Sequence, residues 1–204
     1  MAGKNYLRVF LVRHGETDWN ARGAFQGHSP ISLNDRGRRQ ALLAGQRLRA
    51  AGISHIYTSD LPRARETAAI IQEQLGCPGL TPMKDLRELN FGAWEGLTFG
   101  EIAEQYPQGA HCLLTRPEEL VPPGGEDVST LLDRIKRGWN DILLHNSTGT
   151  IAVVTHAGPI RFLLGLWLKR DPGVFWNLSL PHCGIIYASF PAGGGYPRTL
   201  IFNI

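Results

Sequence analysis

The sequence has few of the features that mark secreted, membrane-spanning or disulfide-rich proteins. Its three cysteines, Cys77, Cys112 and Cys183, are odd in number and lie far apart, with no Cys-x-x-Cys pair. This spacing indicates neither a disulfide framework nor a zinc knuckle. No apolar run approaches the roughly 20 residues that a membrane span requires, and the run near the N-terminus is too short for a signal peptide. We therefore expect a cytoplasmic protein with no membrane association.

An excess of charge of one sign is also missing. The 204 residues include 21 basic and 18 acidic side chains, and the densest basic stretch covers only residues 36–39. A nucleic-acid groove requires more than this, so we expect no nucleic-acid partner and instead expect single arginines to act on a small anion. The length and an apolar content of 43% are typical of one globular domain, which we predict over residues 1–204.

Apolar runs that are typical of buried strands alternate with helical patterns along the chain. The expected strands are at residues 7–12, 53–58, 151–155, 185–190 and 199–202. The expected helices are at residues 35–51, 59–76, 98–106, 124–145 and 160–169. This alternation predicts an α/β layered domain with a mostly parallel sheet.

Two of the expected helices and the chain between residues 107 and 125 have further sequence patterns. The helix at 35–51, capped by Asn34 or Asp35, has Leu42, Leu43 and Leu48 as its apolar residues. Four prolines between residues 107 and 123 predict irregular chain over 107–125, within a cap-like insertion around 89–125. The helix at 124–145 has the strongest apolar stripe, which we assign to the core. Its residues are Val128, Leu131, Leu132, Ile135, Trp139, Ile142 and Leu143.

Two of the expected strands end in a histidine that is followed closely by glycine. These histidines are His14 and His156, and in a parallel sheet both emerge at the edge where ligands bind. A third strand leads to Arg63 in the first turn of a helix, and helix N-termini favour anions. Arg13 and Arg63 can each chelate phosphate oxygens and stay charged. Together these groups predict a site for a compact, highly charged anion.

Four segments resemble, in order, the signature segments of the histidine phosphatase superfamily, also called phosphoglycerate mutase-like. They read LVRHGET (11–17), SDLPRARETA (59–68), LRELNFGAWEG (86–96) and VVTHAG (153–158). An isolated RHG would be weak, but four ordered segments over nearly the whole chain are specific. The resemblance implies a three-layer α/β/α sandwich with a mostly parallel central sheet. It also implies a phosphomonoester hydrolase that acts through a phosphohistidine intermediate.

The resemblance also implies a role for each matching residue. His14 would be the nucleophile, Arg13, Arg63 and His156 would hold the phosphoryl oxygens, and Glu88 would be the proton donor. Further phosphate- or substrate-binding residues would be Asn20, Gln26, Gly27 and Ala157.

The chemistry of these residues is consistent with those roles. A neutral imidazole can attack phosphorus, which divides hydrolysis into transfer to the enzyme and release to water. Arg13, Arg63 and a protonated His156 would stabilise the charge on the moving phosphoryl group. A carboxylic acid such as Glu88 could protonate the leaving alkoxide and then take a proton from the attacking water. We therefore expect neither a metal nor a cofactor.

Several residues have competing interpretations. Glu95 and Glu101 compete with Glu88 for the role of acid, and Glu95 is interpreted as structural. Arg63 could be a helix-surface arginine, as Arg65 is expected to be. His182 is expected to lie outside the pocket. The other histidines and one cysteine are interpreted as structural, namely His28, His55, His111, His145 and Cys183.

The substrate is less defined than the chemistry. Mutases of this family carry an Arg-His-Tyr-Gly element where this chain has residues 90–94, which contain no basic pair, and this favours a phosphatase. NFGAWEG (90–96) and PPGGE (122–126) are similar to α-ribazole phosphatases and to broad-specificity bacterial phosphatases.

The alternative functions are mutase-type transfer, a silent phosphate- or phosphopeptide-binding module, and a metal cluster. The last ranks lowest because the arginines would repel a cation. We expect a small phosphorylated substrate and a monomer or homodimer.

Overall fold

The central feature of this computed structural model is one mixed sheet, and the structure describes residues 6–77, 79–175, 177–193 and 195–202. The sheet has the strand order β3-β2-β4-β1-β5-β6. The strands are β1 (Tyr6–Arg13), β2 (His55–Ser59), β3 (Gly79–Met83), β4 (Gly149–Thr155), β5 (Ile185–Pro191) and β6 (Thr199–Phe202). The four strands from β3 to β1 are parallel, whereas β5 runs antiparallel to both β1 and β6. The mostly parallel sheet is therefore confirmed.

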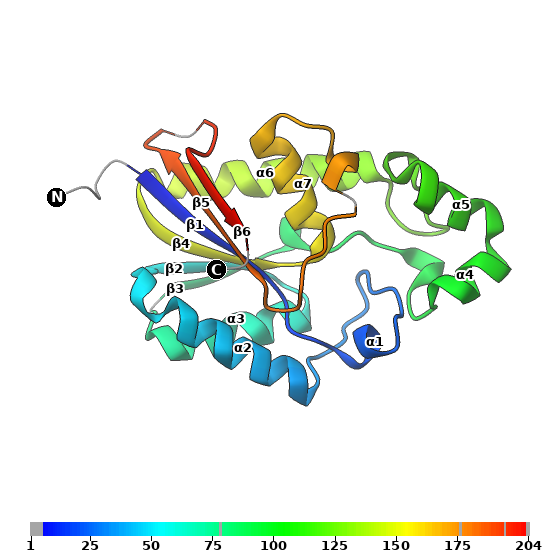
Figure 1. Ribbon diagram of the computed structural model, residues 1–204, viewed down its shortest axis with the longest axis horizontal. Helices are drawn as coiled ribbons and strands as arrows, with labels where there is room; N and C mark the ends of the chain where they lie inside the picture. The colour runs from blue at the N-terminus through cyan, green and yellow to red at the C-terminus, as the bar shows by residue number, and fades with distance from the viewer. Residues whose placement is uncertain (1–5, 78, 176, 194, 203–204) are drawn as a thin grey trace.

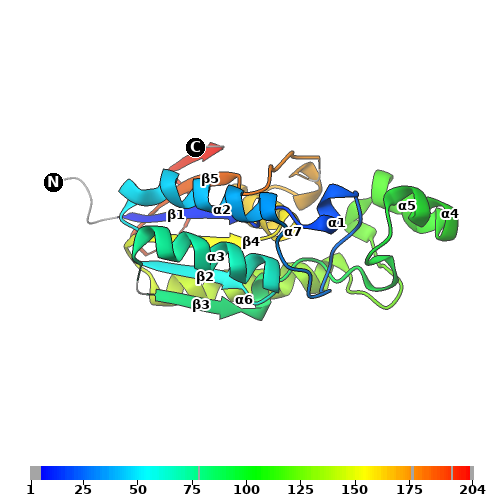
Figure 2. The same ribbon diagram turned by 90° about the horizontal axis from the view of Figure 1, so that it is seen from below.

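Helices cover both faces of the sheet (Figures 1 and 2). On one face lie α2 (Asp35–Leu48) and α3 (Pro62–Leu75), and on the other lie α6 (Val128–His145) and α7 (Ala157–Leu168). The predicted three-layer α/β/α sandwich is thus confirmed. In the described part of the chain, no helix combines the length and apolarity that crossing a bilayer requires.

The helix ends follow from local sequence signals. The side chain of Asn34 accepts a hydrogen bond from the Gly37 N–H at the start of α2, and Asp127 accepts one from Thr130 at the start of α6. Pro62 occupies the first turn of α3, where a missing N–H costs nothing. α7 begins at Ala157, three residues earlier than expected, which makes His156 its N-cap residue.

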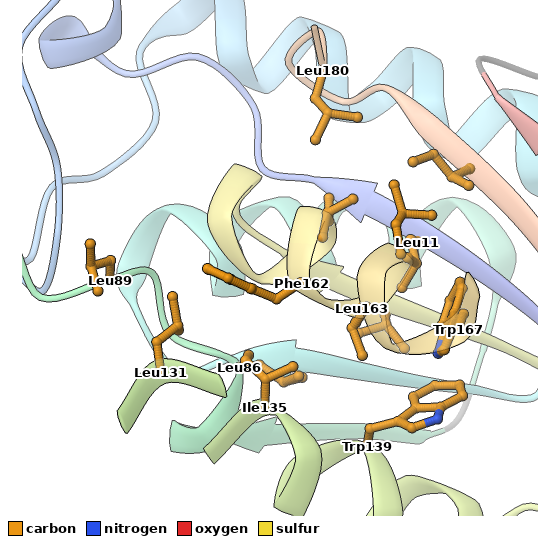
Figure 3. Packing of buried hydrophobic residues seen from close by; sticks show 14 of the residues in the cluster. Leu11, Leu86, Leu89, Leu131, Ile135, Trp139, Phe162, Leu163, Trp167 and Leu180 are labelled. Carbon is orange, nitrogen blue, oxygen red and sulfur yellow. The ribbon is translucent and has the colours of Figure 1, made fainter. Parts of the chain in front are cut away.

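The strand β1 contributes to the core on both of its faces. Leu7, Val9 and Leu11 pack in the cluster under α6 and α7, whereas Phe10 and Val12 pack in the cluster under α2 and α3. Figure 3 shows the first cluster, in which Leu11 lies among side chains from α6 and α7. Burial on both faces explains why this strand is a continuous apolar run.

The structure corrects two details of the expected layers. Leu42 and Leu43 of α2 are 39% and 55% exposed, because α2 packs on α3 through the smaller Ala41 and Ala44 instead. The sheet also gains a sixth strand, β3, which the sequence does not distinguish from loop. β3 is a partly exposed edge strand that contains Pro82, a residue that edge positions tolerate.

The segment between β3 and α6 lies past the carboxyl end of the parallel strands (Figure 2). The helix α4 (Phe99–Gln105) was expected, but α5 (Pro107–Thr115) lies where irregular chain was predicted, so that prediction is wrong for these residues. Pro107 opens α5, because its ring fits the first helical turn, and Ala110 and Leu113 bury one face. The remaining short elements are α1 (Asp18–Ala21), η1 (Arg49–Ala51), η2 (Lys84–Leu86), η3 (Gly92–Trp94), η4 (Pro117–Glu119) and η5 (Pro172–Phe175).

Candidate active site

Strand register brings the two strand-end histidines together. β1 and β4 are neighbouring parallel strands in which Arg13 pairs with Thr155. The next residues are His14 and His156, and the His14 N–H donates to the Thr155 carbonyl at 2.9 Å. Both side chains are buried, and their ring centroids are 5.0 Å apart. The sheet therefore places two imidazoles side by side at its carboxyl edge.

The protonation state of His14 is set by its surroundings. Its Nδ1 lies 2.7 Å from the Gly15 carbonyl oxygen, which can only accept, so Nδ1 carries the proton and Nε2 keeps the lone pair. Burial and then the charges of Arg63 and Arg13 hold the pKa of His14 well below its ordinary value of 6.5. At neutral pH the ring is uncharged, which is the form that can act as a nucleophile.

Two guanidiniums, that of the buried Arg63 and that of the partly buried Arg13, lie near these rings. Arg63 is completely buried, and its terminal nitrogens donate to the carbonyls of Gly27 at 2.8 Å and Ser29 at 3.2 Å. Burial lowers the pKa of Arg63 to about 10, so the side chain remains charged at neutral pH. Arg13 donates to the Leu180 carbonyl. The Nε atoms of Arg13 and Arg63 are buried and have no hydrogen-bond partner among the described residues. Arg63 is thus no surface arginine, and both can donate to an anion.

His156 differs in one respect from expectation. Its Nε2 lies 2.8 Å from the Ser59 hydroxyl oxygen, and its Nδ1 is buried without a partner among the described residues. Burial and then the charge of Arg63 hold the pKa of His156 well below 6.5. The protein's own groups therefore keep His156 neutral at pH 7 rather than protonated. A bound phosphate dianion would oppose this effect by favouring the charged ring.

Glu88 lies against the start of α7. Its carboxylate accepts hydrogen bonds from the backbone N–H groups of Leu89 at 3.0 Å and Gly158 at 3.2 Å. Burial lowers the pKa of Arg13 and Arg63, and the charge of Glu88 opposes this lowering, so Glu88 is electrostatically part of the same site. A Cβ on Gly158 would lie 2.2 Å from Glu88 Oε1, which means that only glycine leaves room for this carboxylate.

Arg134 positions the segment that carries Glu88, and the sequence analysis missed it. Its guanidinium donates to the backbone carbonyls of Asp85 at 3.1 Å and Glu88 at 2.7 Å, and it forms an ion pair with Glu126. Arg134 lies on the buried face of α6, between Leu131 and Ile135. A charged residue within an apolar stripe was the signal that could have identified it.

Asn20 and Gln26 are held by Thr17. The Asn20 Oδ1 accepts from the Thr17 N–H at 3.1 Å, and the Gln26 Oε1 lies 2.8 Å from the Thr17 hydroxyl. Because both carbonyl oxygens face Thr17, both side-chain NH₂ groups point elsewhere. The Gln26 Nε2 is buried and has no partner in the described chain. Contact of these two amides with phosphate stays a prediction.

Gly27 and Ala157 contribute through the backbone. The Gly27 carbonyl accepts from Arg63, so Gly27 positions a guanidinium. Ala157 is the first residue of α7, and its N–H belongs to a helix N-terminus that has no side-chain cap. A phosphate contact by Gly27 or Ala157 remains a prediction.

Glu95 and Glu101 both have structural partners. The Glu95 carboxylate accepts from the backbone N–H groups of His28 and Ser29, each at 2.7 Å, and so fixes the loop whose carbonyls bind Arg63. Glu101 caps the start of α4 through Thr98. Glu88 is therefore favoured over both as the acid of this site.

His182 lies in the site, so its expected place outside the pocket is wrong. Its ring centroid is 6.1 Å from that of His14, and its Nδ1 lies 4.0 Å from Glu16 Oε2. Burial and then Arg13 lower the pKa of His182 to about 4. The loop that carries it is fastened to β1 by the Cys183 N–H, which donates to the Arg13 carbonyl at 3.0 Å. Only this long-range contact reveals its place.

A cavity of about 290 Å³ opens beside Glu88. Four phenylalanines and four leucines contribute to its described lining, together with Glu88, Gly158, Arg161 and Asn177. As for metals, no group of three or more His, Cys, Asp or Glu side chains within the described ranges is placed to hold an ion.

The buried histidines predict acid sensitivity of the fold. His14, His156 and His182 all have a pKa below 6.5, so the unfolded chain binds protons near pH 5 to 6 that the folded chain does not. The free energy of unfolding should therefore fall as the pH drops from 6.5 towards 4, by up to about 1.4 kcal/mol per pH unit for each histidine. Urea denaturation at pH 7.5, 6 and 5 measures this fall. In His182→Asn, the free energy of unfolding should fall less between pH 6 and pH 5, by about the contribution of one histidine. An unchanged fall would contradict the lowered pKa of His182.

The chain is similar to known proteins over most of its length. A family model, the histidine phosphatase superfamily (branch 1), matches residues 9–201. The bifunctional protein Rv2228c of Mycobacterium tuberculosis is 37% identical over 195 residues, and the match covers 95% of this chain and 53% of that protein. The chain thus spans about half the length of this relative. The metal-independent phosphoserine phosphatase of Arabidopsis thaliana is 36% identical over 175 residues, covering 84% of this chain and 74% of that protein.

Solved structures share the fold. A putative alpha-ribazole-5'-P phosphatase from Escherichia coli has a TM-score of 0.86 at 23% identity, covering 97% of this chain and 96% of that one, which shows the fold alone. The mycobacterial glucosyl-3-phosphoglycerate phosphatase Rv2419c, solved with VO3, has a TM-score of 0.84 at 26% identity, covering 97% of both chains.

Proposed function

Because this chain belongs to the histidine phosphatase superfamily, we propose that it hydrolyses small phosphomonoesters through a phosphohistidine on His14, without a metal. One observation carries the proposal. His14 is neutral, its Nε2 has no hydrogen-bond partner among the described residues, and the guanidiniums of Arg13 and Arg63 lie close enough to lower its pKa. This combination provides a nucleophile and the charge that binds a phosphoryl group in one place.

In the first step, His14 Nε2 attacks phosphorus and the bond from phosphorus to the alcohol oxygen breaks. Arg13, Arg63 and the Nδ1 of His156 stabilise the oxygens of the moving phosphoryl group. Glu88, in its acid form, protonates the leaving oxygen. In the second step, the Glu88 carboxylate takes a proton from water, whose oxygen bonds to phosphorus. The N–P bond then breaks, and its electron pair returns to His14.

The residues that line the cavity favour phosphatase activity over mutase activity. A mutase has to hold a second acidic group, and Arg161 is the only cation among the described lining residues. α-Ribazole 5'-phosphate remains one candidate substrate, supported only by fold and by short motifs. The division into one domain with a cap, the cytoplasmic location and the monomeric or homodimeric state also remain predictions, as does the activity of any longer protein of which this chain is part.

Metal independence is tested by hydrolysis of p-nitrophenyl phosphate with and without EDTA. We expect equal rates, because the cations of this site are side chains, and we expect inhibition by vanadate, which mimics the five-coordinate phosphoryl state. Activity that disappears in EDTA and returns with magnesium would contradict the proposal. Vanadate binding without any turnover would identify a silent binding module instead.

A further inference from the structure

The cavity beside Glu88 differs in chemistry from the phosphate site. The phosphate site consists of guanidiniums and buried imidazoles, whereas four phenylalanines and four leucines line the cavity. Its polar lining residues are few, namely Glu88, Arg161 and Asn177. The Arg161 guanidinium donates to the Leu178 carbonyl at 3.0 Å. The cavity is therefore suited to an apolar group and offers few partners to hydroxyls.

Glu88 determines which part of a substrate enters this cavity. Glu88 lines the cavity, and its carboxylate accepts a hydrogen bond from the N–H of Gly158, which lies two residues after His156 of the phosphate site, so Glu88 lies between the two sites. An acid that protonates the leaving oxygen has to touch that oxygen. The alcohol part of the ester, which begins at that oxygen, therefore extends into the cavity.

Buried core residues line one part of the cavity, and exposed apolar side chains line its rim. Leu89, Leu131 and Phe162 belong to the main core cluster and also line the cavity, and Figure 3 shows the Phe162 ring extending from α7 on the side of Leu89. At the rim, Phe99 of α4 and Leu114 of α5 are 37% and 70% exposed. Exposed apolar side chains that gather around a cavity mark a binding site, because a ligand can cover them.

We propose that this cavity binds an aryl or alkyl group of the leaving alcohol. The enzyme then prefers monoesters of apolar alcohols over monoesters of sugars and small hydroxy acids. This inference rests on the proposed phosphatase function, since it names the substrate class of the same site. Each CH₂ group transferred from water into an apolar site is worth about fourfold in affinity or rate.

The test measures kcat/KM for ethyl, propyl, butyl and hexyl phosphate and for glycerol 3-phosphate. The leaving groups of the alkyl series have similar basicity, so differences report binding of the chain. We expect kcat/KM to rise about three- to fourfold for each added CH₂ and to be at least about tenfold lower for glycerol 3-phosphate than for butyl phosphate. A flat alkyl series, or glycerol 3-phosphate as the best substrate, overturns the inference.

Variants of the rim residues test whether the dependence of kcat/KM on chain length arises in this cavity. In the double variant Phe99→Ser/Leu114→Ser, the ratio of kcat/KM for hexyl to ethyl phosphate should fall by about tenfold. The matched control is Leu144→Ser, because Leu144 is 84% exposed on α6 and does not line the cavity. It should leave the ratio unchanged. An unchanged ratio in the double variant overturns the inference. Turnover without chain-length dependence refutes only this inference, whereas no hydrolysis of any ester refutes the proposed function.

Discussion

Replacement of His14 by alanine is expected to lower the turnover of phosphomonoesters by about 10⁴-fold or more, the scale seen when a covalent nucleophile is lost. The reason is that the His14 ring is neutral, its Nε2 has no hydrogen-bond partner in the described part of the chain, and the charges of Arg13 and Arg63 act on it. The fold should persist, because the residue follows the end of β1 and is not part of the apolar clusters. Steady-state hydrolysis of p-nitrophenyl phosphate and circular dichroism measure the two effects.

Trapping of the phosphorylated intermediate in the wild-type protein tests the same role of His14 directly. Wild-type protein, incubated briefly with ³²P-labelled substrate and quenched in alkali, should carry acid-labile label on His14. His145→Ala is the matched variant, since His145 is an exposed histidine at the end of α6, and it should retain both activity and label. Label on a serine or an aspartate would rule out the phosphohistidine mechanism.

In Glu88→Gln, the loss of rate should depend on the leaving group, which tests whether Glu88 is the acid. Glutamine keeps the size of the side chain but cannot donate a proton, so alkyl esters should lose about 10²–10⁴-fold in rate. p-Nitrophenolate leaves without a proton near neutral pH. The burst of p-nitrophenol, measured before the water step limits turnover, should therefore decrease much less than the alkyl rates.

Two further variants separate acid catalysis from positioning. Gly158→Ala puts a Cβ 2.2 Å from Glu88 Oε1 and displaces the carboxylate, so its losses should depend on the leaving group in the same way. Glu95→Gln disturbs the loop that holds Arg63, so its loss should be similar for both ester types. Equal losses for both esters in Glu88→Gln would show that Glu88 only positions the site.

The sequence predicts those parts of the molecule that local patterns encode. The apolar runs of β1 and β4 identify strands buried on both faces, and capping residues such as Asn34 place the starts of helices. Because parallel strands end at one edge, strands followed by His14 and His156 also predict that the two rings meet there. The core stripe of α6 is likewise confirmed, since five of its seven apolar residues are buried in the main core cluster, and the partly buried Leu132 and Leu143 pack against it.

Contacts between segments far apart in the chain could not be predicted in this way. His182 lies in a loop without periodicity, and hydrogen bonds between Cys183 and Gly184 of this loop and Arg13 place it near His14. Arg134 lies 46 residues from Glu88, whose carbonyl it binds.

The cavity also depends on tertiary structure, because α4, α5, α6 and α7 surround it jointly. Periodicity and capping report on neighbours within a few residues, and so the sequence by itself determined the layers, the strand-end histidines and the family of this protein. The packing of the core and the loops decided which other polar side chains lie near those histidines, such as His182, and it formed the cavity beside Glu88.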